Sequence, residues 1–282
     1  MKIGEALRLA AGRLKQQGFS DSYREAQLLM ALVKSWSLPQ LICCNQEELS
    51  SLEQEEYFAF LQRRLGGEPY AYISGYKAFL HWDFVVNSAV LIPRPETELL
   101  VEKAVQELGD VGQDLLLADI GVGSGIVGLS LLGYFPAARL HGVDISGEAL
   151  AVARENAQRL GFSERAQFFQ GDLLQPLATR RGQYQCICAN LPYIPQGEYN
   201  ELSPEVKREP ITALTAGKDG LDCYRRLIPR LGEFLRPGGL VLLEIGHCQG
   251  AEVSRLFAAQ GLQVQVQKDL AGLDRIVWAR YY

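Results

Sequence analysis

Apolar residues in the first 65 positions recur every three or four residues, which places them on one face of a helix. They fall in two runs: Ile3, Leu7, Ala10 and Leu14, then Tyr23, Ala26, Met30 and Val33. Asp21 or Ser22 is suited to cap the second helix. Ser50, with Glu53 three residues later, forms a capping box that predicts a third helix ending near Leu65.

Glycine and proline then interrupt the helical pattern at Gly66-Gly67-Glu68-Pro69. Residues 70–90 alternate aromatic and polar side chains, which predicts a hairpin-like segment. We therefore divide the chain into a helical domain over 1–66, a hairpin-like linker over 67–98 and a larger domain over 99–282. The helical domain either packs only on itself or recognises a partner, and the pattern allows both.

The end of the linker is stiff, because two prolines flank Arg94. Glu96 and Glu98 follow in the first turn of the next helix, where acidic side chains interact favourably with the helix dipole. As an alternative to this purely structural interpretation, Arg94 or Glu98 has a role at the mouth of an active site.

From residue 114 onward, short apolar runs alternate with helical segments, which predicts an α/β fold with a mostly parallel sheet of seven strands. Strands are expected at 115–120, 140–143, 167–169, 184–188, 239–245, 264–267 and 275–279, and helices at 126–132, 148–160, 221–235 and 250–259. No helix separates the last two strands, so one of them must run antiparallel.

Three of the predicted strands end in residues that suit a nucleoside. Gly121-Val122-Gly123-Ser124-Gly125 joins the first strand to a helix, and its glycines permit close approach of a ligand. Asp144 ends the second strand, where such folds bind ribose hydroxyls, although it is also suited to cap a helix. Asp172 ends the third; it either accepts from an adenine amino group, with Leu173 beside the ring, or lies in a plain turn.

The fourth strand ends in Asn190-Leu191-Pro192-Tyr193. The Asn190 side-chain oxygen and the Pro192 carbonyl are two acceptors beside the flat face of Tyr193. This set suits a planar –NH2 group, which has two hydrogens to donate. The same residues are also ordinary turn formers. A nucleoside lying across the first three strand ends would point its reactive end at Asn190.

Composition narrows the classes of protein that fit. The chain has 282 residues, 48% of them hydrophobic and 22% charged, with a net charge of −5 and a pI near 5.4. The negative net charge argues against a protein whose affinity comes from neutralising the phosphates of a nucleic acid. No apolar run reaches membrane-spanning length and no signal peptide is evident, so we expect a cytoplasmic protein. Six cysteines without a C-x-x-C pair and three scattered histidines predict no metal site.

The larger domain resembles class I S-adenosylmethionine-dependent methyltransferases. The residues that carry this resemblance are Asp119-x-Gly121-x-Gly123-Ser124-Gly125, Val143-Asp144, Gly171-Asp172 and the Asn-x-Pro-Tyr loop. From about residue 66 onward, the chain is similar to the glutamine methyltransferases that modify peptide-chain release factors. The similar stretches are Gly67-Glu68-Pro69, Tyr72-Ile73-x-Gly75, Leu91 to Glu98, Glu209-Pro210, Asp219-Gly220-Leu221, Glu244-Ile245-Gly246 and Lys268-Asp269-Leu270.

The resemblance implies a Rossmann-like methyltransferase fold and a role for each matched position. Gly121 to Gly125 and Asp144 hold the methionine and ribose parts of S-adenosyl-L-methionine, and Asp172 and Leu173 lie by its adenine. Asn190 to Tyr193 bind the glutamine amide of a Gly-Gly-Gln segment, with Asn190 also near the donor. The helical domain becomes a substrate-recognition domain for class 1 release factors. We expect a monomer that does not bind nucleic acid directly.

The expected reaction is methylation of the glutamine side-chain nitrogen, with Asn190, Pro192 and Tyr193 as catalytic residues and neither a metal nor a strong base. The family usually has Asn-Pro-Pro-Tyr, whereas Leu191 gives the Asn-Leu-Pro-Tyr form found in ribosomal-RNA adenine dimethyltransferases. A nucleic-acid adenine N-methyltransferase is therefore the alternative. A nicotinamide-dependent enzyme and a nucleoside-binding protein without activity fit less well, because the glycine pattern is shortened and Asn-x-Pro-Tyr suggests transfer.

Overall fold

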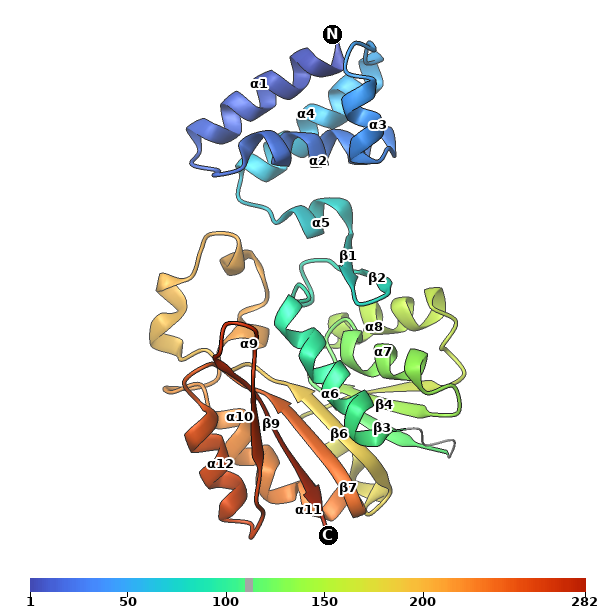
Figure 1. Cartoon of the computed structure of the whole chain (residues 1–282), viewed down its shortest axis with the longest axis vertical. Helices are drawn as coiled ribbons and strands as arrows, with labels where there is room; N and C mark the ends of the chain where they lie inside the picture. The colour runs from blue at the N-terminus through green and yellow to red at the C-terminus, as the bar shows by residue number, and fades with distance from the viewer. Residues whose placement is uncertain (110–113) are drawn as a thin grey trace. The chain divides into compact units, whose positions relative to one another are not determined.

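The computed structural model describes residues 1–109 and 114–282, which form two compact units (Figure 1). The first unit comprises Met1–Gly75 and Pro204–Arg208, and the second comprises Tyr76–Ser203 and Glu209–Tyr282. The sequence-based division at residues 66 and 98 differs from this one, because the linker is shared between the units. Within the described ranges, no helix has both the length and the apolar character needed to cross a membrane.

The first unit is built from five helices packed around a common apolar core. They are α1 (Ile3–Gln16), α2 (Ser22–Lys34), α3 (Leu38–Cys43), α4 (Ser51–Leu65) and α5 (Tyr70–Ser74). The Asp21 side chain caps α2, and Ser50 and Glu53 form the capping box of α4, as the sequence predicts. The expected helical character of this region is confirmed.

The hairpin expected from residue 70 begins later, at Tyr76. Residues 70–74 form α5 instead, because Pro69 starts the turn with its fixed φ and Gly75, at φ +77°, ends it. Strands β1 (Tyr76–Phe79) and β2 (Trp82–Val85) then form an antiparallel hairpin. Glu98 fixes this hairpin by accepting a hydrogen bond from the Leu80 amide at 2.9 Å.

The second unit contains a seven-stranded sheet in the order β5-β4-β3-β6-β7-β9-β8. Its strands are β3 (Leu116–Ile120), β4 (Arg139–Asp144), β5 (Ala166–Gln170), β6 (Tyr184–Asn190), β7 (Leu235–Glu244), β8 (Gln265–Lys268) and β9 (Asp274–Tyr281). β9 is antiparallel to both of its neighbours, and the other pairs are parallel. The predicted mostly parallel sheet with an antiparallel closing strand is confirmed.

Helices cover both faces of this sheet (Figure 1). On one face lie α6 (Glu98–Leu108), α7 (Ile126–Tyr134) and α8 (Gly147–Arg159); on the other lie α10 (Asp222–Leu227), α11 (Leu231–Phe234) and α12 (Gly250–Ala258). Alternate strand residues meet the two layers: Cys186 and Cys188 face the first, and Ile187 and Ala189 face the second. Both faces are therefore buried.

Two segments differ in detail from the expected elements. The single helix expected over 221–235 is interrupted by a 3-10 turn (η5, Ile228–Arg230), because Pro229 has no amide hydrogen to continue it. The long polar loop after Ile194 contains short helices rather than irregular chain. They are η3 (Gln196–Glu201), η4 (Val206–Arg208) and α9 (Ile211–Leu214).

Candidate active site

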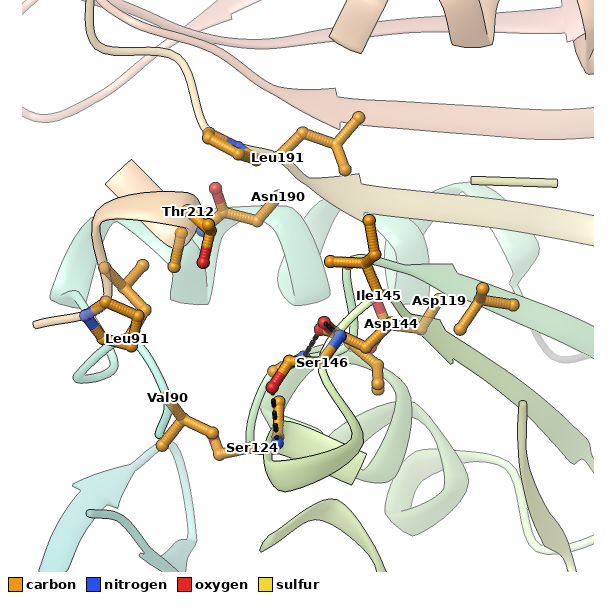
Figure 2. A pocket seen from close by; sticks show the side chains of 18 of the residues that line it. Val90, Leu91, Asp119, Ser124, Asp144, Ile145, Ser146, Asn190, Leu191 and Thr212 are labelled. Carbon is orange, nitrogen blue, oxygen red and sulfur yellow. Dashed lines mark hydrogen bonds between the residues drawn. The ribbon is translucent and has the colours of Figure 1, made fainter. Parts of the chain in front are cut away.

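Four adjacent parallel strands bring the predicted site residues to one edge of the sheet. In spatial order, Asp172 follows β5, Asp144 ends β4, the glycine loop follows β3 and Asn190 ends β6. A cavity of about 470 Å³ opens among these strand ends, entirely within the second unit (Figure 2). This volume and position are typical of a small-molecule site in an open α/β sheet.

Most of the predicted residues line the cavity. They are Gly121, Val122, Gly123, Ser124, Asp144, Asp172, Leu173, Asn190, Leu191 and Pro192. Gly125 and Tyr193 are not among the described residues that form its wall. Gly125 instead starts α7 with φ +88°. Tyr193 packs its ring at the edge of the core, and its carbonyl accepts a hydrogen bond from Gln249 Nε2 at 2.9 Å.

Asp144 is held by the backbone on two sides. Its Oδ2 accepts from the Gly123 amide and its Oδ1 accepts from the Ser146 amide, both at 2.9 Å (Figure 2). Burial raises the pKa of this carboxyl, and these hydrogen bonds oppose the shift. The hydroxyl of Ser146, not Asp144, caps α8 by accepting from the Ala149 amide at 3.1 Å. Each Asp144 oxygen thus retains acceptor capacity for a ligand hydroxyl.

Leu191 packs on the glycine loop. Its side chain is 4% exposed, and a Cβ placed on Gly121 would lie 2.9 Å from Leu191 Cδ2. Figure 2 shows the side chains of Asn190 and Leu191 leaving the end of β6 in different directions. The second position of the Asn-Leu-Pro-Tyr loop therefore shapes the cavity wall between the glycine loop and Asn190.

Asp172 forms an ion pair with Arg226, which also lines the cavity. Asp172 Oδ2 is thus already paired with a side chain of the protein itself. Leu173 adopts a left-handed conformation at φ +51°, uncommon for a residue with a Cβ, and lines the cavity beside Asp172. Sequence reasoning missed Arg226, because it lies 54 residues further along the chain and belongs to no local motif.

An ion pair holds Arg94 in the wall of the cavity. Glu209 has a side chain only 1% exposed; its Oε1 accepts from Arg94 at 2.6 Å, and its Oε2 accepts from the Ile92 amide at 2.9 Å. Arg94 and Pro210 line the cavity, whereas Glu98 does not. Of the two residues considered for the mouth of an active site, Arg94 lines the cavity and Glu98 does not, and Glu209 is the partner of Arg94.

The other lining residues were not assigned to the site from the sequence, although Leu91, Pro93, Thr97, Asp119 and Val143 belong to the stretches that carry the family resemblance. They are Ser88, Ala89, Val90, Leu91, Pro93, Thr97, Asp119, Ile126, Val127, Val143, Ile145, Ser146, Glu148, Ala149, Thr212, Ala213, Thr215 and Cys223. Ile145 is 64% exposed directly after Asp144, so it offers an apolar surface in the cavity wall. In the sequence, the isoleucine directly after the aspartate that ends a predicted strand was the signal that could have marked it.

Two carboxyl groups are buried beneath the site. Asp119 Oδ2 accepts from the Gly128 amide at 2.8 Å, and burial raises the pKa of Asp119 to about 7. Burial likewise raises the pKa of Glu244 to about 7, with the Thr97 hydroxyl and Arg275 opposing the shift. Neither Glu244 oxygen has a partner in hydrogen-bond geometry among the described residues.

The cavity fits S-adenosyl-L-methionine. The loop from Gly121 to Gly125 allows close backbone approach, Asp144 keeps acceptors for a ribose, and Ile145 and Leu173 offer apolar contacts for an adenine. Asn190 stands at the other end, where a transferred group would be received. The fold and the site together define a methyltransferase of the Rossmann-like class.

Comparisons with known proteins give the family. A family model described as PrmC N-terminal domain matches residues 5–75, and one described as Methyltransferase domain matches residues 117–209. The release factor glutamine methyltransferase of Moorella thermoacetica is 42% identical, over 98% of this chain and 97% of that protein. The protein of the same name from Caulobacter vibrioides is 38% identical, over 98% and 96%. The chain belongs to the family of release factor glutamine methyltransferases.

A solved methyltransferase from Pyrococcus furiosus shares the fold with a TM-score of 0.54. The match covers 78% of this chain and 96% of that one, at 16% identity. At this identity the likeness concerns the fold alone.

Proposed function

We propose that this protein transfers a methyl group from S-adenosyl-L-methionine to the side-chain amide nitrogen of the glutamine in the Gly-Gly-Gln segment of class 1 release factors. The observation that carries the proposal is Asn190, which ends β6 at the cavity and whose Nδ2 donates to Thr97 Oγ1 at 3.2 Å. With Nδ2 engaged on that side, Oδ1 is left as an acceptor for a substrate –NH2 group. Near full-length similarity to release factor glutamine methyltransferases supports the choice of substrate.

The donor would be held by the glycine loop around its methionine part, by Asp144 at its ribose and by Asp172 and Leu173 at its adenine. When bound, it supplies an electrophilic methyl group on a sulfonium leaving group. Because Asp172 Oδ2 already pairs with Arg226, Oδ1 is the oxygen left for the adenine amino group. Arg226 orients Asp172 for that contact.

The protein's main task is to improve and align a poor nucleophile. An amide nitrogen shares its lone pair with the carbonyl group, so it attacks weakly. Asn190 Oδ1 and the Pro192 carbonyl would accept its two N–H bonds, which favours electron density on nitrogen and stabilises the positive charge that develops there. Alignment of the nitrogen with the transferred methyl group supplies a further part of the rate. Tyr193 would keep the Asn190 loop in position. Its carbonyl accepts a hydrogen bond from Gln249, and its ring packs at the edge of the core.

Methyl transfer would leave a positively charged, N-protonated amide, which is strongly acidic, so water is a sufficient acceptor for its proton and the product is the neutral N-methyl amide. The cavity wall accordingly needs no strong base at the nitrogen. Asp119 is placed to act on structure instead, because its Oδ2 holds the amide of Gly128 in the first turn of α7.

We assign recognition of the rest of the release factor to the first unit, called the helical unit below, whose residues 5–75 match the PrmC N-terminal domain. The protein would act as a monomer in the cytoplasm, without direct contact to nucleic acid. A short Gly-Gly-Gln peptide should then be methylated with a much lower kcat/KM than the intact factor. Equal kcat/KM for peptide and factor would contradict this assignment.

The test of the site is Asn190→Ala. Loss of an acceptor that acts in the transition state should lower kcat by about 10²-fold or more. Binding of S-adenosylhomocysteine, measured by calorimetry, should remain close to that of the unaltered protein. Asn45→Ala, at an exposed asparagine of the helical unit, is the matched control and should leave both quantities unchanged. A fully active Asn190→Ala protein would refute the role of Asn190.

A further inference from the structure

The Asn190 carboxamide has two ends, and only one of them suits the reaction. Its oxygen must face the cavity to accept from the substrate amide; its –NH2 group in that place would oppose the substrate's own N–H groups. We propose that Thr97 and Glu244 together set this orientation and are positioning residues for methyl transfer. The inference rests on the role proposed for Asn190.

Thr97 is the direct partner. It precedes α6, is fully buried, and lines the cavity. Its Oγ1 accepts from Asn190 Nδ2 at 3.2 Å. A hydroxyl group has one proton to donate. When its oxygen accepts from Asn190, that proton must point elsewhere, and the group it points to decides the direction of the Thr97–Asn190 hydrogen bond.

The acceptor that the inference assigns to this proton is the buried carboxyl group of Glu244. It ends β7 and is paired in register with Asn190 on the neighbouring parallel strand, so the two side chains share one face of the sheet. The same face packs against α6, which Thr97 precedes. The Thr97 hydroxyl opposes the rise in the pKa of Glu244, and it is not in hydrogen-bond geometry with either carboxyl oxygen.

The burial of Glu244 calls for such an explanation. The residue is 1% exposed, and neither carboxyl oxygen is satisfied within the described part of the chain. Burying a carboxyl group without a partner is unfavourable, and an apolar side chain would fill the same space. The strand end itself does not depend on the carboxyl, because its backbone carbonyl accepts from the Tyr224 hydroxyl at 2.6 Å.

The inferred order Glu244–Thr97–Asn190 therefore has a fixed direction. The Glu244 carboxylate attracts the Thr97 hydroxyl proton, the Thr97 oxygen receives the Asn190 –NH2 group, and Asn190 Oδ1 faces the cavity. Without an acceptor at position 244 or a hydroxyl at 97, both orientations of the amide become accessible. In the reversed orientation, the –NH2 group of Asn190 faces the –NH2 group of the substrate, and neither can accept a hydrogen bond from the other.

The experiment compares Thr97→Val, Thr97→Ser and Glu244→Met with the unaltered protein, using intact release factor as substrate. Thr97→Val keeps the shape and removes the hydroxyl; its kcat should fall about tenfold or more, which corresponds to one lost hydrogen bond. Thr97→Ser keeps the hydroxyl and should recover most of kcat. Glu244→Met should lower kcat to a similar degree without lowering the melting temperature. The KM for the donor should stay unchanged in all three.

Ser130→Ala is the control for loss of a buried hydroxyl, because Ser130 is fully buried without a hydrogen-bond partner in the described ranges and lies outside the cavity wall. It should leave kcat unchanged. Full activity of Thr97→Val or Glu244→Met, or equal losses in Thr97→Val and Thr97→Ser, would overturn the inference. If Asn190→Ala is inactive while Thr97→Val is normal, only this inference fails; if Asn190→Ala is active, the role of Asn190 fails first.

Discussion

Glu244 is a buried carboxyl group whose effect on stability depends on pH. Burial raises its pKa from 4.5 to about 7, so between these values the folded state holds a proton that the unfolded state has lost. Its contribution to stability therefore falls as the pH rises through this window, and the full penalty is present above about pH 7. The pKa of Asp119 is raised in the same direction, so its contribution to stability also falls as the pH rises, but replacement of Glu244 leaves Asp119 in place.

The corresponding prediction is a pH-dependent gain in stability. Glu244→Met should raise the melting temperature at pH 8, where a shift of this size corresponds to about 3 kcal/mol at most, and change it little at pH 4.5. Scanning calorimetry across that range measures the difference. A gain that is the same at both pH values would show that packing, rather than the buried charge, is responsible.

Gly121 is the second residue whose identity is dictated by its contacts. Its φ of +76° disfavours any side chain, and an added Cβ would lie 2.9 Å from Leu191 Cδ2. Gly121→Ala should lower the free energy of unfolding by about 1–3 kcal/mol and weaken donor binding. Gly197→Ala is the control, since Gly197 has open space around its Cβ position and no positive φ. Unchanged donor affinity in Gly121→Ala would contradict this account of the loop.

At the scale of elements, Gln249 joins three loops at the carboxyl ends of the strands. Its Nε2 donates to the carbonyls of Tyr193 and Asp219, at 2.9 and 3.3 Å, and its Oε1 accepts from the Gly246 amide at 2.9 Å. The loop after β6 is thereby anchored directly behind Asn190.

Gln249→Glu removes the donor and places a carboxylate against two carbonyl oxygens. We expect a loss of about 1–3 kcal/mol in stability and a lower kcat, because the anchor of the Asn190 loop is lost. Denaturant unfolding and single-turnover kinetics measure the two effects. Gln263→Glu, at an exposed position, should change neither. Normal turnover in Gln249→Glu would mean that the loop keeps its position without this anchor.

The contrast between strand ends and tertiary contacts shows what the sequence was able to predict. The glycine loop, Asp144 and Asn190 were predictable, because each directly follows an apolar run and parallel strands align their carboxyl ends. The ion pair between Glu209 and Arg94 was not, since 115 residues separate the two and no periodicity connects them. Tyr193 was assigned to the cavity for its chemistry, but Gln249 holds its backbone so that the ring packs at the core edge.

At the scale of the whole molecule, the helical unit includes a segment from the middle of the long loop, Pro204–Arg208. Arg64 holds it there. The Arg64 side chain is 4% exposed, and it forms ion pairs with Glu25 at 2.7 Å and with Glu205 at 2.9 Å. The loop that leaves the active-site strand is thus also part of the other unit.

Arg64→Met should leave both acids without their partner and destabilise the helical unit by about 2–3 kcal/mol, less than for a fully buried pair because Glu205 is half exposed. Deuterium exchange of residues 204–208 should become faster. Arg63→Met removes a more exposed ion pair, with Glu68, and should have an effect below about 1 kcal/mol. Unchanged exchange at 204–208 in Arg64→Met would show that other contacts hold the segment.

The central claim is the identity of the methylated atom. The most direct test incubates the protein with labelled S-adenosyl-L-methionine and a purified class 1 release factor, then locates the label by peptide mass spectrometry. A second sample uses a factor whose Gly-Gly-Gln glutamine is replaced. We predict one methyl group on that glutamine and no label on the altered factor. Label on both factors, or label on ribosomal RNA or DNA and on neither factor, would contradict the account.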